Sequence, residues 1–110
     1  MAYCAEADLI QAYNSETILS MSREANDDEA IDSAKVTSAC DEASALADDY
    51  LQSSGVTTPY TGTWDSLKSR SIDIAVYFLA RQEGAMRDDI LTRYEQAITW
   101  LERISSGDIA

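Results

Sequence analysis

The sequence predicts an all-α fold, a compact bundle of about four to five helices in one domain spanning residues 1–110. Three observations support this prediction: apolar residues recur at helical spacing, alanine is abundant, and there are only four glycines and one proline. A chain of this length can build one modest core. Its longest apolar stretch must be covered on several sides, by other helices or by another subunit.

Two short helices are expected at the start of the chain. The first covers residues 5–13, and the second ends at Met21 with Ser15 as its N-cap. An acidic loop is then expected over residues 22–32. Its carboxylates suggest a calcium site, but the glycine and the final glutamate of an EF-hand loop are missing, which favours a solvated acidic loop.

A long helix is expected over residues 33–53, capped by Asp32, because small and apolar residues recur there every three or four positions. The following segment, 53–63, contains two glycines and the only proline, so we expect a flexible loop. Connections of this length in compact domains are often functional. The candidate partner-binding residues of this loop are Val56, Thr57, Thr58, Pro59 and Tyr60.

Residues 67–82 are the most apolar stretch and predict a central helix, with Gly84 placed after its C-terminus. Only one narrow edge of this helix is polar, and its residues follow the spacing i, i+3, i+7, i+11. Such an edge either balances its own charge or contacts another subunit. The candidate subunit-interface residues are Arg70, Asp73, Tyr77 and Arg81 on this edge, with Trp100 from the next helix.

The clearest amphipathic pattern predicts a last helix over residues 86–105, followed by a tail over 105–110. Asp89 and Arg93 can pair on it at i, i+4. Trp100 lies at the edge of the apolar stripe, where it either flanks the core or anchors a partner.

The charge of −12 makes binding to nucleic acid phosphates unfavourable, because such binding depends on lysine and arginine. The charge is uneven: residues 1–60 carry 12 acidic and 2 basic side chains, and residues 61–110 carry 8 and 6. No histidine is present, which excludes Ser-His and Cys-His nucleophilic sites and His-based zinc sites. We therefore predict no enzymatic activity, no metal and no cofactor.

Cys4 and Cys40 do not form a CxxC pair, and we expect both to be small buried residues without a disulfide. The opening residues have neither a basic segment nor a long apolar run, so we expect no signal peptide and no membrane span.

Asp65-Ser66-Leu67 at the start of a helix resembles the site at which acyl carrier proteins receive phosphopantetheine on the serine. The helix of that family continues with acids, whereas here Lys68 and Arg70 follow. A small acidic carrier is therefore one alternative function, and an acidic mimic of DNA that occupies the groove of a basic partner is another.

A second resemblance covers nearly the whole chain in order. Its motifs are Tyr3-Cys4 with Asp8-Leu9, Ala30-Ile31-Asp32-Ser33-Ala34, Ala43-Ser44-Ala45-Leu46 with Asp49-Tyr50-Leu51, Asp73-Ile74-Ala75 with Tyr77, and Arg93-Tyr94-Glu95-Gln96-Ala97 with Trp100-Leu101 and Gly107. In these motifs the chain resembles the Mu-like phage head-tail connector family, the small helical adaptor and head completion proteins of the virion neck. It departs from that family in an acidic loop without glycines and a polar loop around Pro59.

This resemblance implies a structural protein made in the bacterial host cytoplasm and located in the virion neck. The family implies a ring of identical subunits between the portal protein and a tail-side neck or tail terminator protein. DNA passes through the ring without specific binding, and no catalytic residues are implied. Acids on the inner wall would repel the DNA, and the candidate acidic channel face is Asp41, Glu42, Asp48 and Asp49.

Overall fold

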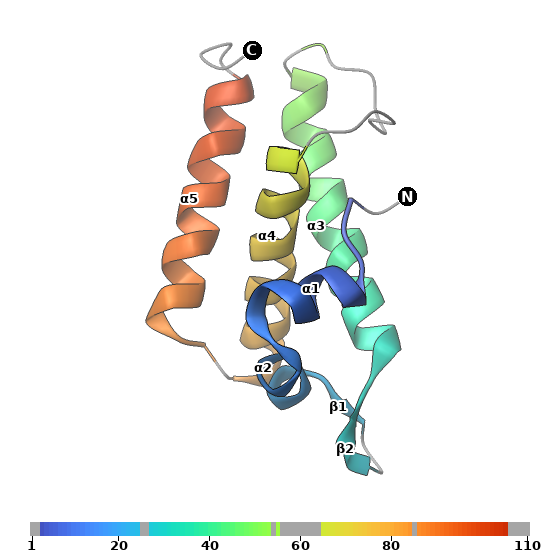
Figure 1. The fold of residues 1–110 in the computed structure, drawn as a ribbon. Helices are drawn as coiled ribbons and strands as arrows, with labels where there is room; N and C mark the ends of the chain where they lie inside the picture. The colour runs from blue at the N-terminus through green and yellow to red at the C-terminus, as the bar shows by residue number, and fades with distance from the viewer. Residues whose placement is uncertain (1–2, 25–26, 54, 56–64, 85, 106–110) are drawn as a thin grey trace.

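The computed structural model describes residues 3–24, 27–53, 55, 65–84 and 86–105 of the chain (Figure 1). Within these residues the chain forms five helices, which confirms the predicted all-α bundle. They are α1 (Glu6–Tyr13), α2 (Ser15–Met21), α3 (Ser33–Ser53), α4 (Asp65–Glu83) and α5 (Asp88–Ser105). The three long helices lie side by side in Figure 1, and in the lower half of the view α1 packs against α3 and α4 and α2 against α4.

Helix α4 is the centre of the bundle, because α1, α2, α3 and α5 all contact it. Leu67, Ile74, Val76 and Leu79 are at most 2% exposed although they point in different directions around the helix. Phe78 is half-buried. The sequence left open whether another subunit must cover this helix. The structure shows that helices of the same chain cover it, so its apolar surface gives the folded chain no reason to associate.

Helix α3 approaches α4 and α5 through small side chains. Ala39, Ala43 and Ala47 are at most 1% exposed and follow one another every four residues along its buried face. Larger residues complete the same face, with Val36 and Leu51 fully buried. Burying one such larger side chain contributes roughly 1.5–3 kcal/mol relative to leaving it in water, so this face is a main source of the bundle's stability.

The expected acidic loop over 22–32 is wrong in part, because the structure has a two-stranded hairpin there. Strand β1 (Arg23–Glu24) pairs with β2 (Asp27–Ile31) in antiparallel orientation, with Arg23 opposite Ile31 and an irregularity in the register. Acidic residues are rare in strands, so composition argued against them. A strand pair is held by backbone hydrogen bonds, which need no apolar pattern when the hairpin lies at the edge of a helical bundle.

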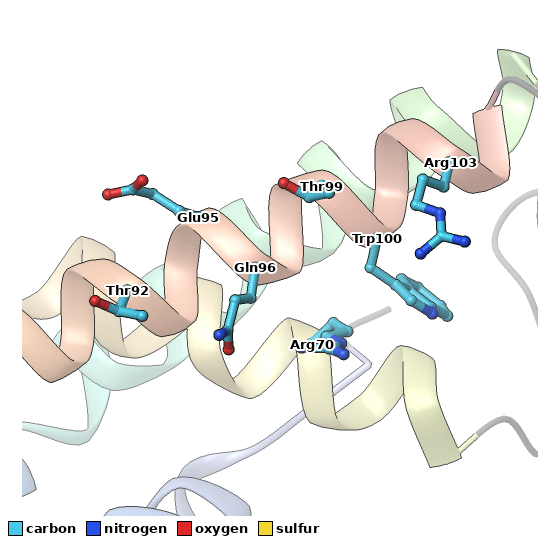
Figure 2. A pocket seen from close by; sticks show the side chains of 7 residues that line it. All are labelled: Arg70, Thr92, Glu95, Gln96, Thr99, Trp100 and Arg103. Carbon is cyan, nitrogen blue, oxygen red and sulfur yellow. The ribbon is translucent and has the colours of Figure 1, made fainter.

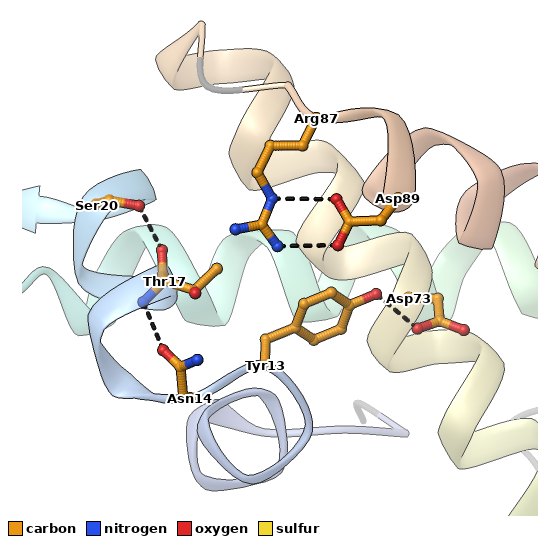
Figure 3. Close-up of polar contacts among 7 residues, drawn as sticks. All are labelled: Tyr13, Asn14, Thr17, Ser20, Asp73, Arg87 and Asp89. Atoms are coloured by element: carbon orange, nitrogen blue, oxygen red, sulfur yellow. Dashed lines mark hydrogen bonds and ion pairs between the residues drawn. The ribbon is translucent and has the colours of Figure 1, made fainter.

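The cap of α2 also differs from the prediction by one residue. Asn14, not Ser15, is the N-cap: its Oδ1 accepts a hydrogen bond of 2.9 Å from the backbone N–H of Thr17 (Figure 3). Asn14 has a φ of +75°, a region that asparagine adopts more readily than most residues. This conformation lets α2 start directly after α1 in a new direction.

Two other predicted helix ends are confirmed. The Asp32 carboxylate caps α3 by accepting hydrogen bonds from the backbone N–H groups of Ala34 at 3.0 Å and Lys35 at 3.4 Å. Gly84 follows α4 with a φ of +66°, and its N–H donates to the carbonyl of Arg81. Glycine carries no Cβ penalty in this conformation, which explains its place at the helix end.

The start of α5 falls at Asp88, two residues later than predicted. The expected local pair of Asp89 with Arg93 is only a minor interaction, because Tyr13 and Asp73 raise the pKa of Arg93 more than Asp89 does. Arg87 instead binds Asp89 through two hydrogen bonds of 3.1 and 3.0 Å (Figure 3). Arg93 lies over the ring of Tyr13, with its guanidinium carbon 4.9 Å from the ring centroid. A tertiary partner thus outweighs the local pair.

Cys4 and Cys40 are buried, at 5% and 2% exposure, and no disulfide joins them, as predicted. The thiol of Cys4 is hydrogen-bonded to Cys40 and shielded from water, and both effects raise the pKa of Cys4 above that of a free cysteine. The two residues join the segment before α1 to the middle of α3. The predicted flexible loop lies outside the described residues except for Ser53 and Gly55, as does the tail beyond Ser105.

Candidate interaction surfaces

A groove of about 320 Å³ lies where α5 meets the first half of α4. Its walls combine two arginines, one tryptophan, one acid and three neutral polar residues. They are Arg70 from α4, and Thr92, Glu95, Gln96, Thr99, Trp100 and Arg103 from α5. In Figure 2 the side chains of Gln96, Trp100 and Arg103 project from α5 toward the side on which Arg70 projects from α4.

Arg70 and Trp100 were both predicted as interface residues, and the structure brings them to this one groove. Each is half-buried. A groove with two cations and a large aromatic ring can accept a carboxylate-bearing segment, because arginine binds carboxylates through charge-assisted hydrogen bonds and tryptophan supplies contact area.

The other predicted interface residues face partners within the chain. Asp73 is half-buried, and its Oδ1 accepts a 2.8 Å hydrogen bond from the hydroxyl of Tyr13, which is only 6% exposed (Figure 3). Tyr13 belongs to α1 and Asp73 to α4, so this bond fastens the N-terminal helices to the bundle. Arg93 adds α5 to the same cluster through its contact with the Tyr13 ring.

The electrostatics of this cluster follow from its burial. Loss of water raises the pKa of Asp73, although the hydrogen bond from Tyr13 and the charges of Arg93 and Arg70 oppose the rise. Burial likewise raises the pKa of Tyr13 to about 12. The Tyr13 hydroxyl therefore keeps its proton at neutral pH and remains the donor to Asp73.

Tyr77 and Arg81 lie further along the same edge of α4 and contact aromatic rings. The ring of Tyr77 stacks on that of Tyr94 in α5, with centroids 3.7 Å apart and an angle of 13° between the planes. The guanidinium carbon of Arg81 lies 5.7 Å from the ring centroid of Tyr77 and 5.1 Å from that of Phe78. The polar edge of α4 is thus largely the seam between α4 and its own neighbours.

The four acids of the predicted channel face do project from the outer side of α3. Asp41, Glu42 and Asp49 are exposed. Asp48 is half-buried, and its Oδ1 accepts a hydrogen bond from the hydroxyl of Tyr3. The set therefore divides into Asp48, which holds the segment before α1, and acids that face solvent. The candidate loop residues Val56, Thr57, Thr58, Pro59 and Tyr60 lie outside the described residues.

Ser66, the residue that resembles a phosphopantetheine site, is exposed in the first turn of α4. Lys68, two residues further along, forms a 3.1 Å ion pair with Asp8 of α1. A positively charged side chain therefore lies close to the serine. Partner enzymes of acyl carrier proteins recognise acids around that serine. A lysine beside Ser66 therefore does not favour a carrier function. Within the described residues, no group of three or more histidine, cysteine, aspartate or glutamate side chains is placed to hold a metal ion.

Sequence reasoning missed the roles of Tyr3 and Tyr13 as hydroxyl donors. Tyr13 falls at the end of the first predicted helix, and the pattern assigns no role to its hydroxyl. A buried tyrosine usually finds a partner for its hydroxyl, so a carboxylate on the facing helix was a signal available in principle. The facing residue is 60 positions away along the chain, and the sequence pattern cannot identify it.

None of the described helices combines the length and the apolar character needed to cross a membrane. A search of curated proteins found no match. A family described as "Bacteriophage Mu, Gp36" matches residues 3–110, which is nearly the entire chain. The match includes the groove, the Tyr13–Asp73 contact and the acidic face of α3, and by its extent the chain belongs to the bacteriophage Mu Gp36 family.

Proposed function

We propose that this protein is a structural virion component, a head-tail connector that forms a ring between the portal and the tail-side neck proteins of a Mu-like phage. The observation that carries the proposal is the family match over residues 3–110, which makes the chain a phage protein along its whole length. The resemblance of its motifs to phage connector proteins gives the more specific role.

The fold is compatible with a repeated building block. Its apolar core is enclosed by its own helices, and its outer surfaces on α3 and α5 are mostly polar apart from Leu91, so copies can meet through polar contacts without refolding. A ring needs two different surfaces on each subunit that fit each other. The acidic face of α3 and the groove at α5 are two different surfaces of one subunit.

The charge fits a wall along which DNA slides. Each subunit carries a net charge of −12, so a ring multiplies a negative field around its axis. DNA is repelled by such a wall, which allows passage without specific binding. The partners in this proposal are further copies of the chain, the portal protein and a tail-side neck or terminator protein.

Quantitative mass spectrometry of purified phage particles tests the proposal. We expect the protein in particles, in a copy number that matches the portal ring or bears a fixed ratio to it. Particles prepared from a phage with this gene deleted provide the matched control, and we expect filled heads without tails. A protein that is abundant in infected cells but absent from intact particles would contradict the proposal.

A further inference from the structure

We propose that the groove lined by Arg70, Trp100 and Arg103 binds the acidic outer face of α3 from a second copy of this chain. This contact presupposes the ring of the proposed function and assigns its two surfaces. In this proposal Glu42 and Asp49, which the sequence analysis assigned to the channel face, lie in the subunit contact instead.

The first step is the shape of the α3 surface. Ser38, Glu42, Ala45, Asp49 and Gln52 are all exposed and follow one another every three or four residues, so they form one continuous ridge along the helix. This set is called the α3 ridge below. Two acids stand on it seven residues apart, about 10 Å along the axis.

The second step is charge complementarity. The groove has two guanidinium groups and only one carboxylate, that of Glu95, on a chain whose net charge is −12. The α3 ridge has two carboxylates and no basic residue. Opposite charges on two surfaces of one molecule favour a contact between copies. They also determine its orientation, because two ridges repel each other and so do two grooves.

The third step concerns the fit of the large side chain. Ala45 lies between Glu42 and Asp49 on the ridge and leaves a flat space on the helix surface. The indole ring of Trp100 can pack there, while Arg70 and Arg103 on either side reach the two carboxylates. A tryptophan surrounded by charged pairs is typical of the residues that contribute most to binding.

The fourth step is the position of the two surfaces on the molecule. The ridge is on the side of α3 that faces away from α4 and α5, and the groove is at the junction of α4 and α5. In Figure 1, α3 and α5 lie on either side of α4. One subunit can therefore use its ridge and its groove at the same time, as a head-to-tail ring requires.

Charge reversal of each surface separately tests the contact. The ridge variant Glu42→Lys with Asp49→Lys and the groove variant Arg70→Glu with Arg103→Glu should each weaken self-association at least about tenfold, measured by sedimentation velocity over a range of concentrations. The matched control, Glu16→Lys with Glu102→Lys, changes net charge as much as the ridge variant on exposed positions outside both surfaces and should keep native assembly.

Mixing the two variants gives the sharpest result. The ridge variant keeps an intact groove and the groove variant keeps an intact ridge, so an equimolar mixture can form one native contact. The reversed ridge and the reversed groove also carry opposite charges, so the mixture should recover the association that each variant alone has lost. Circular dichroism checks that each variant is folded. Because the groove variant changes a partly buried arginine, the ridge variant, with only exposed changes, decides the question if the groove variant unfolds.

Two outcomes would overturn the contact: native assembly by the ridge variant, or a native chain that stays monomeric up to about millimolar concentration in low salt. Particle composition separates this failure from failure of the proposed function. Assembly that is insensitive to the ridge, with the protein present in particles, rejects only the contact. A ridge-dependent assembly of a protein absent from particles rejects only the connector role.

Discussion

At the scale of single residues, Tyr13 connects three helices of the bundle. Its hydroxyl donates to Asp73 of α4, and its ring lies under Arg93 of α5. One side chain of α1 therefore links this helix to α4 and α5, which both lie far from it in the sequence. Phenylalanine at this position keeps the ring that Arg93 covers and removes the hydroxyl that donates to Asp73.

Tyr13→Phe is expected to lower the free energy of unfolding by about 1–2 kcal/mol, because Asp73 then loses its donor while remaining half-buried. Urea denaturation followed by circular dichroism measures the change. Tyr94→Phe is the control: among the described residues the Tyr94 ring stacks on Tyr77 and no hydrogen bond of its hydroxyl is present, so a change within about 0.5 kcal/mol is expected. Equal effects of the two variants would contradict a specific role of the Tyr13 hydroxyl.

At the scale of elements, the alanine face of α3 determines how closely the long helices pack. Ala43 is 0% exposed and has no room for a larger side chain unless α4 or α5 moves away. The corresponding exposed position is Ala34, near the start of the same helix. The two alanines differ in burial and share the same secondary structure.

Ala43→Leu is expected to destabilise the protein by about 1–3 kcal/mol through overpacking, although leucine is an excellent helix former and adds apolar area. Ala34→Leu should change stability by less than about 0.5 kcal/mol. Thermal denaturation of both variants beside the native chain measures the difference. A stabilised Ala43→Leu protein would show that α3 does not pack tightly on its neighbours.

The elements also show what the sequence could and could not predict. The long helices were predictable because burial of one face leaves a repeating apolar pattern, and Asp32 and Gly84 were predictable because helix ends require particular backbone or side-chain chemistry. The β1–β2 hairpin was not, since backbone pairing leaves little trace in an acidic stretch. Asn14 was overlooked as a cap because Ser15 beside it is equally suitable by residue type.

The same division applies to the candidate surfaces. The spacing of Arg70, Asp73, Tyr77 and Arg81 correctly placed these residues on one edge of a helix. Their partners are determined by tertiary packing: Tyr94 is on the following helix and Tyr13 is 60 residues away from Asp73. Trp100 was identified as an edge residue, but a groove that joins it to Arg70 depends on how α4 and α5 are aligned.

At the scale of the whole molecule, charge is the dominant feature. The chain has 20 acidic and 8 basic side chains. Two ion pairs of the described residues are Lys68–Asp8 and Arg87–Asp89, and most of their charged groups are exposed. Ion pairs at the surface contribute little to stability. Repulsion among the remaining acids therefore outweighs local attraction and works against the compact state.

The thermal midpoint of the monomer is accordingly expected to rise by several degrees when sodium chloride increases from about 10 to 300 mM, because the screening length falls from about 30 Å to below 8 Å. Differential scanning calorimetry at low protein concentration measures it, and potassium chloride should give the same rise. The variant Glu16→Gln with Glu102→Gln should show a smaller rise of the thermal midpoint with salt, because it carries fewer negative charges. A midpoint that falls with salt would mean that attractive ion pairs dominate.

The enclosure of α4 has a consequence for the order of events in an infected cell. Since helices of the same chain cover it, a new subunit can complete its fold without waiting for a partner. Folding and association are therefore separate steps. In the ring proposed above, the meeting of finished surfaces, and not the rate of folding, determines when assembly starts.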